Sequence, residues 1–129
     1  MIARYNPDVA PSPSEWLALD EQTRLDLVRL YHADHSGAAP RYEKAHYVIH
    51  VILETQLAEG IQAIVDAFVR MQHEGLSRHD AIHAVGSILL RHLREMLKPG
   101  KDGKAAWLEY VMDVERLHAS QWLNGEEDP

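Results

Sequence analysis

The stretch that decides the fold is Tyr47-Val48-Ile49-His50-Val51-Ile52-Leu53-Glu54. It lies in a predicted helix over about 41–59 that is apolar nearly all round, which is typical of a central, buried helix. His50 and Glu54 interrupt the apolar run one turn apart, and His46 lies one turn earlier. At about 100° per residue these three positions drift only about 80° around the helix, so they share one face. The sequence therefore predicts polar side chains inside the core.

A second segment repeats this arrangement. His79 and His83 lie one turn apart in a helix predicted over about 77–97, and His83 is set among apolar residues. A buried polar group without a partner costs several kcal/mol, and a buried carboxylate costs more unless it is paired. Two helices that each carry such groups on one face can satisfy them by facing each other.

The two histidine pairs predict a metal site. Histidines at i and i+4 have Cβ atoms about 5–6 Å apart, so two imidazoles can bind one ion. Nitrogen and oxygen ligands suit zinc best, and with open positions they also suit iron, manganese or nickel. If the ion keeps an open coordination position, Glu54 is the candidate general base for a metal-activated water. If the ion has no open position, Glu54 is a ligand or orients a histidine ring. The predicted metal site consists of His46, His50, Glu54, His79 and His83.

Short loops favour parallel directions for the two histidine-bearing helices, but they leave the register open. Either His46 and His50, or His50 and Glu54, can face the second pair. We therefore predict a metal-binding protein without choosing which four of the five residues bind the ion. No substrate follows from the sequence, and whether the protein is an enzyme stays open.

Three other interpretations remain. The first is a metal-free structural or partner-binding module, in which a buried histidine network fixes the helix packing and Trp107 and Trp122 contact a partner, such as the second copy in a homodimer. The second is a metal-dependent hydrolase of the HD type, because His79-Asp80 follows an upstream His50 and precedes Asp113. The third is a carboxylate-bridged di-metal bundle, for which Glu43 and Asp80 each precede a histidine by three residues.

The chain has 129 residues, which is the usual size of one domain. We predict an all-α, single-domain helical bundle of four to five main helices with short loops over 14–123. An extended, Pro-rich arm over 1–13 precedes it, and a frayed acidic tail follows over 124–129. The other predicted helices are a short one capped by Ser14, one over about 21–34 capped by Asp20, one over about 61–74 and one over about 105–123.

Further signals concern the helix ends and the last helix. Gly60 and Gly75 are predicted to end the helices that precede them. Ser77 is the predicted cap of the helix that carries His79 and His83. In the last helix, the residues predicted to pack inward are Trp107, Leu108, Val111, Met112 and Leu117.

Composition narrows the class of protein. The formal charge of −7 and the lack of a Lys/Arg block argue against nucleic acid as a partner. There is no cysteine, which excludes disulfides and thiolate ligands. The apolar runs are too short for a membrane span, and the N-terminus lacks the apolar core of a signal peptide, so we expect a cytoplasmic protein.

Nine histidines are the one compositional oddity. His32 and His35 fall at the end of a predicted helix, where a cation interacts favourably with the helix dipole, so we expect them at the surface. The remaining histidines outside the predicted site are expected to be solvated: His73, His92 and His118.

Three stretches together resemble a widespread but uncharacterised family of small, His-rich, all-helical bacterial proteins with a domain of unknown function. They are 15–21, the helix from His46 to Ala58, and the segment from Gly75 to Ser87. The resemblance covers about residues 5–97, and its last motif is the most specific. It implies a bacterial origin but no activity. Members often carry Glu at the position of Asp80, which weakens the HD-type hypothesis.

Overall fold

The computed structural model describes residues 2–35 and 43–123, in which all regular structure is helical. The all-α prediction is confirmed, whereas a bundle of four to five main helices stays a prediction. The predicted break at 36–40 and the predicted tail at 124–129 lie outside the described residues. The helices are α1 (Pro13–Ala18), α2 (Glu21–His35), α3 (Glu43–Ala58), α4 (Gln62–His73), α5 (Arg78–Met96), α6 (Gly103–Glu115) and α7 (Ala119–Leu123).

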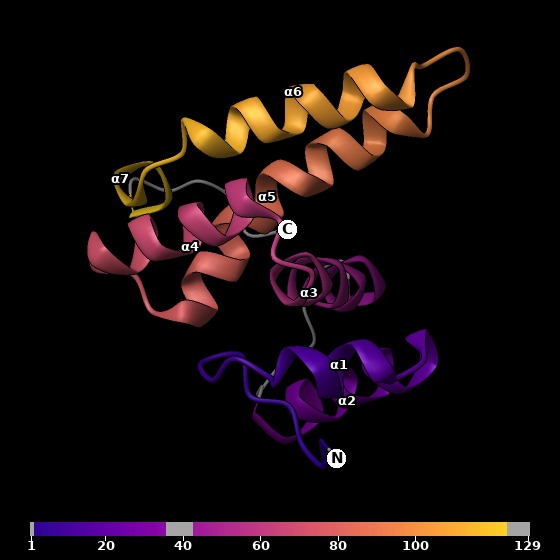
Figure 1. Cartoon of the computed structure of the whole chain (residues 1–129), viewed down its shortest axis with the longest axis vertical. Helices are drawn as coiled ribbons and strands as arrows, with labels where there is room; N and C mark the ends of the chain where they lie inside the picture. Colours follow the sequence, from indigo (N-terminus) through magenta and orange to yellow (C-terminus); the bar gives the residue numbers. More distant parts are fainter. Residues whose placement is uncertain (1, 36–42, 124–129) are drawn as a thin grey trace. The chain divides into compact units, whose positions relative to one another are not determined.

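The chain divides into two compact units, Met1–Ile61 and Gln62–Pro129, called unit 1 and unit 2 below. In unit 1, α3 packs against both α1 and α2 (Figure 1). In unit 2, α5 and α6 lie side by side, and α4 packs against both of them (Figure 1). The predicted single domain over 14–123 stays a prediction.

The core of unit 1 joins the arm to all three helices. Its buried apolar side chains include Tyr5 from the arm and Trp16 from α1. The indole nitrogen of Trp16 donates a hydrogen bond to Thr55 Oγ1 on α3 (3.1 Å), which satisfies its one polar group. Arg24 on α2 donates to the Trp16 carbonyl (3.1 Å), and its guanidinium lies 5.9 Å from the centre of the indole ring. The arm is therefore part of the packed structure. The cluster consists of Tyr5, Trp16, Leu27, Val28 and Tyr47.

Helix α3 is buried on most of its surface, as predicted. No residue from Ala45 to Ala58 is exposed, and Ile49 and Leu53 are fully enclosed. No single helix in the described ranges is long and apolar enough to cross a membrane, and only α3 and α4 taken together pass that test.

Two of the three predicted N-cap residues are confirmed. The backbone N–H of Thr23 donates to Asp20 Oδ1 (2.7 Å), and Ser77 Oγ accepts from the N–H of Asp80 (3.0 Å), so both predicted caps are confirmed. The prediction for α1 was wrong, because its N-cap is Ser12 rather than Ser14. Pro13 takes the first helical position, where its fixed φ and missing N–H suit a helix start.

The predicted helix ends at Gly60 and Gly75 are confirmed. Both residues have positive φ, 71° and 108°, a region that side chains other than glycine rarely adopt. The turn after α4 closes with a hydrogen bond from the N–H of Leu76 to the carbonyl of Met71 (3.0 Å). These glycines let the chain leave each helix without steric strain.

Helix α6 faces the core with a different side from the predicted one. Its buried residues, Ala106, Tyr110 and Val114, are spaced by four. Trp107 is 36% exposed and Leu108 54% exposed, and Met112 is exposed as well. The prediction that these three pack inward was wrong, because apolar residues also occupy the opposite face of this helix and only tertiary contacts select one.

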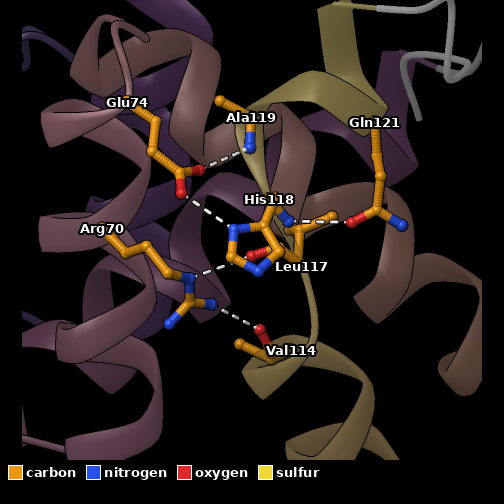
Figure 2. A network of polar contacts seen from close by, with 7 residues as sticks. All are labelled: Arg70, Glu74, Val114, Leu117, His118, Ala119 and Gln121. Atoms are coloured by element: carbon orange, nitrogen blue, oxygen red, sulfur yellow. Dashed lines mark hydrogen bonds and ion pairs between the residues drawn. The ribbon is translucent and has the colours of Figure 1, made fainter.

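The predicted single helix over 105–123 was also wrong, because the chain breaks into α6 and α7. Arg70 on α4 donates to the carbonyls of Val114 (2.9 Å) and Leu117 (3.0 Å). These hydrogen bonds satisfy backbone carbonyls that the end of α6 leaves without a helical partner. Glu74 accepts from the N–H of Ala119 and from Nδ1 of His118, each at 2.8 Å (Figure 2). These bonds hold the corner between the two helices against α4.

Candidate metal centre

The polar stripe of α3 is buried, as its spacing predicts. His46 is 3% exposed, His50 is fully buried and Glu54 is 2% exposed. The three side chains lie one turn apart and share one face, so two imidazoles and a carboxylate lie inside unit 1. Burial of this kind is costly unless the groups have partners.

His32 on α2 joins this stripe from the opposite side. It is 7% exposed, so the prediction of a surface position was wrong. Its Nδ1 lies 2.8 Å from the carbonyl of Val28 and its Nε2 lies 2.9 Å from Nε2 of His46. A carbonyl only accepts, so Nδ1 of His32 carries a proton, and when the ring is neutral its lone pair is on Nε2, the atom that faces His46.

The imidazoles of His32, His46 and His50 form a compact trio. One potential ligand atom from each lies within 4.8 Å of the other two, and the ring centres are 4.7–4.9 Å apart. Tetrahedral zinc with Zn–N bonds of about 2.0–2.1 Å holds neighbouring nitrogens about 3.4 Å apart. Side-chain shifts of about 1 Å would bring the three nitrogens to the spacing that one ion needs, so the trio could hold a metal ion.

Tyr5 connects the trio to Glu54. Its hydroxyl donates to Glu54 Oε2 (2.6 Å) and lies 3.0 Å from Nδ1 of His50. The hydroxyl has a single proton, and it uses this proton in the hydrogen bond to Glu54. The phenolic oxygen of Tyr5 therefore accepts a hydrogen bond from the Nδ1–H of His50. When the His50 ring is neutral, its lone pair is then on Nε2. Metal-bound histidines are commonly held in this way, with the second ring nitrogen donating to a carboxylate, a carbonyl or another polar group.

Sequence reasoning missed both Tyr5 and His32. His32 continues the apolar stripe of α2, seven residues after Leu25 and four after Val28, and this spacing was a signal for burial. Tyr5 lies in a segment without helical periodicity, and no pattern in the sequence connects it with α3. Its ring packs edge-on against His50 at 5.9 Å and against Tyr31 at 6.1 Å.

The second predicted pair, His79 and His83, lies on α5 in unit 2. The two rings are 4.5 Å apart between centres, which agrees with one turn of helix, and both side chains are partly exposed. They form an i,i+4 pair of the expected geometry. That they share an ion with α3 stays a prediction.

The structure adds no support for the hydrolase of the HD type or for the di-metal bundle. Asp80 is exposed in the first turn of α5, and the side chain of Glu43 lies outside the described part. Asp113 Oδ2 lies 2.8 Å from Nε2 of His92, which is buried, so the prediction of a solvated His92 was wrong. This bond joins α5 to α6. His118 is exposed, as expected, and bonded to Glu74.

No family model, no curated protein and no solved structure matches the chain. The resemblance to a bacterial family of unknown function therefore stays a prediction. The buried histidines could hold a metal ion.

Proposed function

We propose that unit 1 binds one divalent metal ion, zinc in the first place, through His32, His46 and His50. The observation that carries the proposal is the convergence of three buried imidazoles from two helices, with potential ligand atoms all within 4.8 Å. The bond from His32 to the Val28 carbonyl supports it, because it leaves Nε2 able to bind the ion.

The ligand set favours zinc over harder cations. Imidazole suits zinc, copper, iron and nickel, whereas magnesium and calcium prefer oxygen ligands. Glu54 adds a negative charge next to the site, which offsets part of the positive charge of the ion. Three protein ligands leave a fourth position for water in tetrahedral zinc.

Within this site, Glu54 and Tyr5 orient His50. Glu54 accepts a hydrogen bond from the hydroxyl of Tyr5, and the same hydroxyl accepts one from His50. The carboxylate is therefore connected to the ligand His50 through two hydrogen bonds. This arrangement favours an orienting role for Glu54 over a general base. The ion would also link α2 to α3 and stabilise unit 1, because binding to the folded state alone adds to its stability.

Elemental analysis tests the proposal. The protein is purified without a histidine tag or nickel resin, and its metal content is measured. We expect about one zinc per chain, and His32→Gln and His50→Gln should each lose it. His73→Gln, at an exposed position of α4, is the matched control and should keep the metal.

A His79→Gln, His83→Gln double variant examines the prediction that the second pair shares the ion. Loss of metal in this variant would extend the ligand set to α5. Full retention would restrict the site to the three histidines of unit 1.

A second candidate, the metal-free network, is favoured by one observation. His32 bonds His46 and Tyr5 bonds both His50 and Glu54, so these groups have partners without an ion. A wild-type protein that is folded, metal-free and insensitive to added zinc would support this structural module instead.

A further inference from the structure

A small pocket opens on unit 1 between the arm and α2. Its volume is about 210 Å³. This is below the range of drug-sized pockets, about 300–1,000 Å³. It therefore suits a small metabolite. The lining residues are Ala3, Arg4, Tyr5, Leu27, Leu30, Tyr31, Asp34 and His35.

The pocket has an apolar floor and a charged rim. Tyr5 and Leu27 are buried, so they form the floor. Arg4, Asp34 and His35 are exposed and form the rim. A ligand that fits both regions has an apolar body and a charged head.

The rim carries both signs of charge. Arg4 and Asp34 line the same pocket, yet within the ranges that the structure describes neither forms an ion pair or a side-chain hydrogen bond. A guanidinium matches a carboxylate, and an aspartate matches an ammonium group.

We propose that this pocket binds a small zwitterion, an α-amino acid with an aliphatic side chain. Arg4 binds its carboxylate, Asp34 binds its ammonium group, and Leu27, Leu30 and the tyrosine rings contact its side chain. Tyr5 belongs both to the pocket and to the hydrogen bonds around His50, so the ligand would contact a residue of the proposed metal centre. The proposal does not depend on a bound metal.

An NMR titration of the full-length, ¹⁵N-labelled protein with L-leucine tests the proposal. Chelator is present, so the result is independent of metal binding. We expect amide shift changes centred on the arm and on the last two turns of α2. Isocaproate lacks the ammonium group and isoamylamine lacks the carboxylate, and each should bind about tenfold more weakly, since each loses one charge-assisted hydrogen bond.

Variants assign the two charged groups. Arg4→Gln and Asp34→Asn should each weaken L-leucine binding about tenfold. Arg29→Gln and Asp26→Asn are the matched controls, because these two residues pair with each other on α2 (2.8 Å) and do not line the pocket, so binding should be unchanged. Absence of shift changes with L-leucine, equal binding of isocaproate, or equal weakening by the control variants would overturn the proposal.

Discussion

Replacing Tyr5 by Phe tests the connection between the arm and the candidate metal centre. The substitution removes one oxygen and keeps the ring, so the packing against His50 and Tyr31 is retained. His50 and Glu54, both almost fully buried, each lose a hydrogen bond. A buried group that loses its partner costs about 1–3 kcal/mol, so the two together predict a loss of about 2–6 kcal/mol. This is a substantial part of a typical total stability of about 5–15 kcal/mol.

The same substitution should weaken zinc binding about 10–100-fold, because the hydrogen bond that orients His50 is gone. Urea unfolding of the metal-free protein measures the stability, and competition with a chromophoric chelator measures the zinc affinity. Tyr31→Phe is the control, because it removes the same oxygen from the neighbouring ring that packs on Tyr5 at 6.1 Å. Zinc affinity and stability equal to those of the wild type in Tyr5→Phe would refute the orienting role.

Three further predictions concern unit 2. The pKa of Glu74 is lowered, first by the backbone N–H that it accepts and then by His118, so its stabilising effect is present above about pH 4.5 and is lost as the pH falls through the lowered pKa. Glu74→Gln should therefore lower the melting temperature at pH 7, and the difference should shrink in acid. Gly75→Ala, at a φ of 108°, should destabilise the protein by about 1–2 kcal/mol in urea unfolding. Arg70→Met should cost about 1–3 kcal/mol in the same assay, because carbonyls at the end of α6 lose a donor.

Controls for the Glu74 and Gly75 variants come from the same unit. Glu109→Gln changes an exposed carboxylate on α6 and should leave the melting temperature unchanged at both pH values. Gly103→Ala introduces the same methyl group at a helical position without positive φ and with open space around it, so no loss is expected. A Glu74→Gln deficit that stays constant down to pH 3 would contradict the lowered pKa, and an unchanged Gly75→Ala protein would contradict the turn geometry.

The sequence predicted the part of the site that depends on one helix. His46, His50 and Glu54 follow each other at intervals of four in an apolar helix, and periodicity alone places them on one buried face. His32 was predicted at the surface because it lies at a helix end, but it also continues the apolar stripe of α2, and its contact with His46 on α3 buries it. Tyr5 depends on a contact 45 residues away along the chain, and no local pattern encodes such a contact.

The same division holds for the fold. Caps and glycine stops were predicted correctly at Asp20, Ser77, Gly60 and Gly75, because they depend on the conformational preferences of single residues. The break after α6 could not be predicted, since it depends on hydrogen bonds from α4 to backbone groups distant in the sequence.

X-ray absorption spectroscopy of the zinc-loaded protein tests the central claim most directly. We expect about three imidazole nitrogens at about 2.0–2.1 Å from the ion, and about one fewer imidazole in any zinc-bound His32→Gln protein. Zinc that binds without imidazole ligands, or an unchanged imidazole count and zinc affinity in His32→Gln, would contradict it.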